Sequence, residues 1–178
     1  MKKLFLLPVL ALFLTSLSSC EDESLNPLPV MVPGQYVRLD IDDSHKQMDF
    51  NDIQNTYFGG MLSVPANNVV KFDLMVRRSV SGELTSDYVP LMTITSFPYD
   101  LKITPQMVAT ALGVQVADLK DGDLYRFYGY SYDANGKVAT YRNLSSLNQS
   151  TPAMEQGYRF NTELTSTPDE IYNNRALN

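Results

Sequence analysis

The sequence predicts an all-β fold, a single antiparallel β-sandwich of about eight strands with one short helix. From residue 34 onward, short segments alternate between apolar and polar residues, and turn-forming residues separate them. The stretch from Leu119 to Gly136 shows this best, because an acidic turn there leads into an aromatic strand and then a hairpin turn. A body of about 130 residues is long enough to bury one core.

The first predicted strands cover residues 36–41 and 56–64, and the polar segment between them offers Phe50 and Ile53 as its only strong core candidates. The clearest strand covers residues 69–77, where side chains of two kinds alternate. The face predicted to cover the core consists of Val70, Phe72, Leu74 and Val76. The opposite face consists of Lys71, Asp73, Met75 and Arg77.

The following segments predict two more strands and the helix. Residues 88–95 are predicted to form a strand in which Pro90 lies at a sheet edge or near the start of the strand, since proline cannot donate to a ladder. Residues 101–103 are predicted to form a short strand. A two-turn helix is predicted over residues 106–112. It is enclosed by an N-cap, a proline at the first helical position and a C-cap, namely Thr104, Pro105 and Gly113.

The central strand runs from Leu124 to Tyr132 and alternates along its length. Asp133–Gly136 tolerates positive φ, so the chain is expected to reverse there into a strand over residues 138–142. A last strand is predicted over residues 156–164. The domain boundaries predicted are a signal peptide at 1–19, a tether at 20–33, the sandwich at 34–165 and a C-terminal tail at 166–178.

The spacing of Leu119, Gly122 and Tyr125 resembles the tyrosine corner of fibronectin type III and related immunoglobulin-like sandwiches. The resemblance implies an immunoglobulin/fibronectin III-like fold in which Tyr125 bonds back to upstream backbone and Phe127 also faces the core. It departs from the family at Asp121, where proline is usual, so a less rigid turn is expected. An ordinary aromatic strand in an unrelated β fold is the alternative.

The N-terminal residues predict a targeting signal. Lys2 and Lys3 precede an apolar run at residues 4–14, which is too short to span a bilayer, and small polar residues then lead to Cys20. This layout is that of a secretory signal, and residues 17–20 resemble the bacterial lipobox, in which the cysteine is lipidated. A lone buried cysteine is the alternative.

The acidic residues Glu21, Asp22 and Glu23 resemble the surface-export signal of Bacteroidota lipoproteins. A merely solvated charge run, which would leave the protein on the periplasmic side, is the alternative. Loss of residues 1–19 removes two of the 14 basic residues and none of the 20 acidic ones, which leaves a formal charge of −8. This charge argues against nucleic acid or anionic lipid as a direct partner, so the expected anchor in outer-membrane lipid is acylated Cys20.

Catalytic and metal-binding patterns are weak in this sequence. The single histidine, His45, excludes a multi-histidine metal site and leaves a Ser-His-Asp arrangement dependent on a polar loop. Aspartates at 40, 42, 43, 49 and 52 could form a loose calcium site but not an EF-hand. No catalytic residue, metal or cofactor is therefore predicted, and an enzyme fragment with a carboxylate pair remains a minor alternative.

Lipobox, acidic signal, proline-containing tether and strand-rich body together resemble the small surface lipoproteins of Bacteroidota polysaccharide-utilisation loci, of the starch-utilisation E/F kind. The resemblance implies a non-enzymatic, surface-exposed outer-membrane lipoprotein that binds glycan and has other surface lipoproteins or a transporter as partners. The rival interpretation is a structural or adhesive subunit that contacts proteins through the edges of its sandwich.

One ligand-binding row follows from the alternation of the central strand. If Tyr125 and Phe127 face inward, the opposite face presents Arg126, Tyr128, Tyr130 and Tyr132. Successive tyrosines would be about 6.6 to 6.8 Å apart, near the repeat of sugars in a chain. Such a row could hold an extended glycan by ring stacking. Alternatively, neighbouring elements cover the row, or the two faces are inverted.

Overall fold

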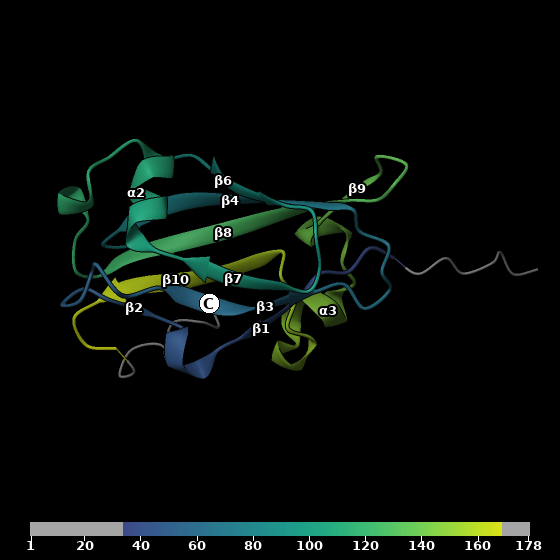
Figure 1. The fold of residues 1–178 in the computed structure, drawn as a ribbon, viewed down its shortest axis with the longest axis horizontal. Helices are drawn as coiled ribbons and strands as arrows, with labels where there is room; N and C mark the ends of the chain where they lie inside the picture. The colour runs from purple at the N-terminus through teal and green to yellow at the C-terminus, as the bar shows by residue number, and fades with distance from the viewer. Residues whose placement is uncertain (1–33, 169–178) are drawn as a thin grey trace, which may run out of the picture. The chain divides into compact units, whose positions relative to one another are not determined.

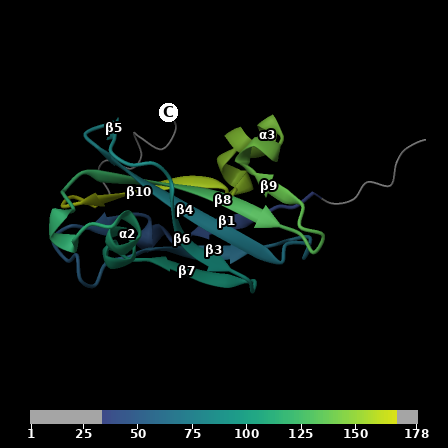
Figure 2. The ribbon, with the colours of Figure 1, turned by 90° about the horizontal axis from the view of Figure 1, so that it is seen from above.

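The computed structural model describes residues 34–168, which form two packed β-sheets and confirm the predicted all-β sandwich (Figure 1). The smaller sheet has the strand order β1-β3-β7 and is antiparallel throughout. Its strands are β1 (Arg38–Ile41), β3 (Phe58–Ser63) and β7 (Tyr99–Ile103). In Figure 2, β3 and β7 of this sheet lie below β10, β8 and β4 of the larger one.

The larger sheet has the order β2-β10-β8-β4-β5, with β6 paired to β4 and β9 paired to β8. Its long strands are β4 (Lys71–Val80), β8 (Asp123–Tyr132) and β10 (Arg159–Thr165). Its short strands are β2 (Met48–Asp49), β5 (Glu83–Leu84), β6 (Val89–Ile94) and β9 (Val138–Thr140). Its three long strands lie side by side in the antiparallel order β4-β8-β10.

The predicted helix is α2 (Pro105–Leu112), and it begins and ends at the predicted capping residues, Thr104 and Gly113. The hydroxyl of Thr104 accepts a hydrogen bond from the backbone of Met107 at 3.2 Å, and Gly113 adopts the left-handed conformation with φ of 69°. Val108 and Ala109 are fully buried. The helix therefore covers part of the core beside β4 and β6 (Figure 1).

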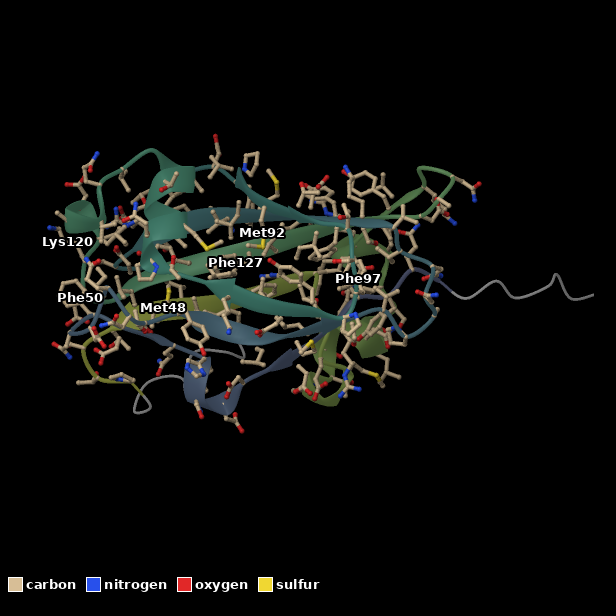
Figure 3. All side chains as sticks on the ribbon, viewed as in Figure 1. Met48, Phe50, Met92, Phe97, Lys120 and Phe127 are labelled. Carbon is tan, nitrogen blue, oxygen red and sulfur yellow. The ribbon has the colours of Figure 1, made fainter. Side chains whose placement is uncertain are left out.

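The core is organised around β8, whose inward side chains meet the smaller sheet. Phe127 lies in the interior (Figure 3), with its ring centroid 4.9 Å from that of Phe160 on β10 and 6.1 Å from that of Phe58 on β3. Tyr125 and Phe127 are fully buried, as the alternation of the strand predicts. Since each fully buried aromatic side chain contributes about 1.5 to 3 kcal/mol by leaving water, this cluster is a main source of stability.

Gly129 leaves room in the same layer for Phe72 on β4. A β-carbon at position 129 would lie 2.2 Å from the ring of Phe72, which is closer than β-carbons approach other non-hydrogen atoms in proteins. The ring fills this space and meets Tyr158 edge-on, with centroids 5.9 Å apart. A side chain at position 129 would therefore displace a buried ring.

One core assignment made from periodicity is wrong, and one core residue was not predicted. Val70 is 50% exposed, because β4 begins one residue later and the core does not extend to it. Met48 is fully buried, whereas the predicted candidates Phe50 and Ile53 are partly buried and pack against the core. Met48 and Phe50 are labelled in Figure 3. Met48 is drawn inward because β2 pairs in parallel with the end of β10, a contact between residues far apart in sequence.

The predicted hairpin forms at Asp133–Gly136, but its second strand is shorter than expected. The Asp133 carboxylate accepts hydrogen bonds from the backbone of Asn135 and Lys137, at 2.9 and 2.8 Å. β9 ends at Thr140 because this residue caps the 3-10 helix η4 (Tyr141–Asn143). The polar segment that follows contains α3 (Ser146–Ser150) and η5 (Pro152–Met154), which alternation did not predict.

The turn before β8 differs from the tyrosine corner that it resembles. The Tyr125 hydroxyl donates to the side chain of Asp123, at 3.4 Å, and not to upstream backbone. Oδ2 of Asp123 also accepts from Arg78 at 2.6 Å and from the backbone of Lys120 at 2.8 Å. Burial, together with the Asp123 carboxylate, raises the pKa of the Tyr125 hydroxyl, which therefore remains a donor.

Asp121, where the family usually has proline, has a role of its own. Its carboxylate accepts hydrogen bonds from the backbone and the hydroxyl of Ser166, at 2.8 and 2.6 Å. These bonds from Ser166 hold the pKa of Asp121 below its ordinary value of 3.8. The turn is thus tied to the residue that follows β10 instead of being stiffened by a proline ring.

Candidate functional site

The predicted ligand-binding row lies on the outer face of the larger sheet. Side chains of β8 alternate between buried and half-buried along its whole length. The half-buried positions, which point away from the smaller sheet, include all four residues of the row: Arg126, Tyr128, Tyr130 and Tyr132. The faces of the strand are therefore oriented as the sequence predicts.

Strand pairing adds side chains from β4 to this row. Lys71 lies opposite Tyr132, Asp73 opposite Tyr130 and Met75 opposite Tyr128. Tyr88, just before β6, joins from the other side of β4, with its ring centroid 5.7 Å from that of Tyr128. We call the surface formed by Tyr88, Tyr128, Tyr130 and Tyr132 the tyrosine face.

The rings of the tyrosine face do not form parallel platforms. The rings of Tyr128 and Tyr130 are 5.4 Å apart at an interplanar angle of 60°, and those of Tyr88 and Tyr128 are inclined by 55°. Edges of some rings therefore contact faces of others, which is a favourable aromatic geometry. The result is a clustered aromatic surface in place of the evenly spaced row that strand geometry alone predicts.

A polar group adjoins this surface at Tyr132. The ammonium of Lys71 lies 3.9 Å from the centroid of the Tyr132 ring and 2.8 Å from Oδ2 of Asp73. The hydroxyl of Thr93 donates to Oδ1 of Asp73 at 2.7 Å. Burial opposes ionisation of Asp73, but the hydrogen bonds from Lys71 and Thr93 outweigh it and lower the pKa of the carboxyl.

The same surroundings keep the Tyr132 hydroxyl protonated. Burial and the neighbouring Asp73 carboxylate raise the pKa of Tyr132 above its ordinary value of 10.0. Hydrogen bonding to Asp73 likewise raises the pKa of Lys71, so the ammonium keeps its charge. Around neutral pH the polar group beside Tyr132 therefore presents the Tyr132 hydroxyl, the Lys71 ammonium and the Asp73 carboxylate next to an aromatic ring.

Two hollows in the surface lie away from the tyrosine face. One, of about 500 Å³, lies beside α2 and is lined by Phe50, Ile53, Gln54, Gln106, Gln115, Val116, Ala117 and Leu119. None of these lining side chains titrates, so this hollow lacks acid–base groups of its own. A second, also of about 500 Å³, lies between β1, β10 and the α3 region, and Arg159 lines it.

The polar residues considered for metal binding or catalysis serve local structure. His45 stacks on Tyr57 at a centroid distance of 4.0 Å, and its Nδ1 lies 2.9 Å from Asp42. Asp49 and Asp52 each accept a hydrogen bond within their own turn. Among residues 34–168, no group of three or more histidine, cysteine or acidic side chains could hold a metal ion.

The lipidation and export residues, Cys20 and Glu21, Asp22 and Glu23, lie outside the described residues. Within the part of the chain that the structure describes, no helix is long and apolar enough to cross a membrane. The predicted binding row is thus the part of the sequence-based site that the structure places.

The fold and the tyrosine face define a β-sandwich with an aromatic patch on the outside of its larger sheet. No family model matches the chain, and no curated protein matches it. Function must therefore be argued from the surface itself.

Sequence reasoning missed the contribution of neighbouring strands to this surface. Lys71, Asp73 and Arg77 were correctly placed on the non-core face of their strand, but nothing linked them to the tyrosines. Tyr88 was included in a predicted strand without a role. The available signal was the outward alternation of residues 69–77, which becomes informative once β4 is known to pair with β8.

Proposed function

We propose that this protein is a non-enzymatic lipoprotein of the outer-membrane surface that binds glycan for a polysaccharide uptake system. The tyrosine face carries the proposal, because four half-exposed rings adjoin the hydrogen-bonding group of Lys71, Asp73 and Thr93. Apolar faces of sugars stack on aromatic rings, and sugar hydroxyls bond to such polar groups. Clustered rings suit a short stretch of glycan better than a long extended one.

The edges of the sandwich favour this proposal over the adhesive alternative. β6, which pairs only with β4, carries Pro90, and β7, at the end of the smaller sheet, carries the exposed pair Asp100 and Lys102. Proline and charged side chains are devices that oppose strand addition at a sheet edge. Binding through the outer face therefore fits the surface better than contacts through these edges.

The glycan test uses a double variant, Tyr128→Ala with Tyr130→Ala. Loss of both rings should weaken binding to whichever polysaccharide of the test panel binds the unmodified protein. The affinity should fall by at least about tenfold, because the stacking surface is removed. Binding to a panel of insoluble polysaccharides, measured beside a thermal melt, checks this. The Tyr128→Phe, Tyr130→Phe variant keeps both rings and should retain most binding.

The matched control is Tyr57→Ala, which removes a half-buried tyrosine next to the smaller sheet. It should leave affinity unchanged. Undiminished binding by the Tyr128→Ala, Tyr130→Ala variant would remove the tyrosine face from the proposal. A fall in melting temperature far beyond that of the Tyr57 control would show instead that the two rings serve the fold.

Lipid anchoring and export to the cell surface are proposed from the sequence alone, and they have their own test. Cys20→Ala should abolish membrane association, since burial of acyl chains contributes about 0.8 kcal/mol per methylene and is the proposed anchor. Replacing Glu21, Asp22 and Glu23 with alanine should leave the protein lipidated but protected from protease added to intact cells. Continued cleavage of this triple variant on intact cells would contradict the export signal.

A further inference from the structure

Two arginines face each other beside the tyrosine face. Arg77 on β4 and Arg126 on β8 are direct partners in the antiparallel register, and both are half-buried on the outer face. Directly opposed side chains on one face have β-carbons about 4.5 to 5.5 Å apart, so two positive charges there repel each other. The outer face therefore carries an unfavourable charge pair that an anion would relieve.

Within the described residues, neither arginine takes part in a salt bridge. Within residues 34–168, the salt bridges are formed by other cationic residues, namely Arg38, His45, Lys71, Arg78 and Lys102. The nearest acidic partner on β4, Asp73, is already engaged by Lys71 and Thr93. The positive charge of Arg77 and Arg126 is confined to this part of the surface, and it contrasts with the chain as a whole, which is acidic with a formal charge of −6.

Arg77 is positioned as an anion-binding group. Its guanidinium lies 4.5 Å from the centroid of the Tyr88 ring, so one of its faces is covered by the tyrosine face. Its Nε is buried and has no hydrogen-bond partner among the described residues. A stacked guanidinium keeps its edges clear of the ring, and because Nε is buried, the two terminal amino groups are the donors left for the two oxygens of a carboxylate.

A third arginine extends the positive charge across the sheet. Arg159 on β10 lies opposite Tyr128 in the register, with its guanidinium 5.3 Å from the Tyr141 ring. Tyr128 thus has Arg126 two residues before it on its own strand and Arg159 beside it on the next. In Figure 2, β5 and α3 rise on the side of the larger sheet that faces away from the smaller one.

Building on the glycan-binding function proposed above, we infer that the ligand is an acidic polysaccharide whose uronate carboxylates are bound by Arg77 and Arg126. The sugar ring stacks on Tyr128 or Tyr88 while the carboxylate lies between the two guanidinium groups. A carboxylate matches the planar fork of arginine in a bidentate manner and cancels the repulsion across the strands. Attraction of this kind weakens as salt rises.

The test compares polygalacturonate with the same polymer after methyl esterification, which keeps the sugar backbone and removes the charge. The full protein should bind polygalacturonate, lose affinity as sodium chloride is raised, and bind the esterified form at least about tenfold more weakly. Arg77→Gln and Arg126→Gln should each lower affinity for polygalacturonate by about tenfold or more. Lys102→Gln, which removes the same charge on the smaller sheet, should have no effect.

Thermal melts distinguish binding from a structural role. Because the two arginines repel each other, Arg126→Gln should leave the melting temperature unchanged or raise it. Equal binding of charged and esterified polymers, lost in the Tyr128→Ala, Tyr130→Ala variant, would overturn this inference but keep the glycan-binding function. Equal binding of sulfated dextran would overturn it as unspecific attraction of polyanions, and retention of no polysaccharide would overturn both proposals.

Discussion

Replacing Asp123 with alanine is expected to lower the free energy of unfolding by about 3 to 5 kcal/mol. The carboxylate is fully buried and lies 2.6 Å from the guanidinium of Arg78, whose side chain is only 13% exposed. Without it, the nearly buried Arg78 guanidinium loses its ion-pair partner and keeps the Asp118 carbonyl as an acceptor, while the Lys120 amide and the Tyr125 hydroxyl lose the Asp123 carboxylate. Urea denaturation of the Asp123→Ala variant measures the loss.

A double-mutant cycle separates the ion pair from the rest of the turn. Arg78→Ala and Asp123→Ala should be strongly non-additive, with a coupling energy above about 1 kcal/mol, since each single variant leaves the other group uncompensated. Asp121→Ala is the matched control, because it removes an exposed carboxylate of the same turn and should shift the midpoint far less. Additive effects in the cycle would mean that the pair between β4 and β8 contributes little.

Replacing Phe72 with alanine is expected to lower the free energy of unfolding by about 3 to 5 kcal/mol as well. Its ring is fully buried, fills the space above Gly129 and contacts the ring of Tyr158. Because Gly129 has no side chain that could move into the cavity, little relaxation is available, and the loss should fall in the upper part of this range. Denaturation midpoints measured with an unchanged m-value check it.

Val70→Ala is the control for Phe72. Periodicity places both residues on one face of the strand, but Val70 is 50% exposed, so its truncation should change stability by less than about 0.5 kcal/mol. Similar losses for the two variants would mean that the core extends to the start of β4. A small loss for Phe72→Ala would contradict the close packing at Gly129.

The two proposals concern one surface and depend on different groups. Stacking depends on ring area at the tyrosine face, whereas selection of a charged sugar depends on Arg77 and Arg126. Lys71 is neutralised by Asp73, so it can bond to sugar hydroxyls without adding to the net positive charge. Ring variants therefore test whether glycan binds, and arginine variants test which glycan binds.

The sequence by itself determined those strands and helices whose formation depends only on a short run of neighbouring residues. The alternation of residues 124–132 specified β8 and the face on which Tyr128 and Tyr130 lie. Thr104, Pro105 and Gly113 specified both ends of α2, because capping depends only on neighbouring backbone groups. These features need no information about distant residues.

Tertiary structure decided what distant segments bring to each other. The pairing of β4 with β8 places Arg77 opposite Arg126, and the parallel pairing of β2 with β10 buries Met48. Alternation gives the face of a side chain but not the strand that lies next to it, since register is set by burial across the whole sheet. For the same reason the Tyr125 hydroxyl has the Asp123 carboxylate as its partner: Arg78, brought close by β4, holds that carboxylate in the core.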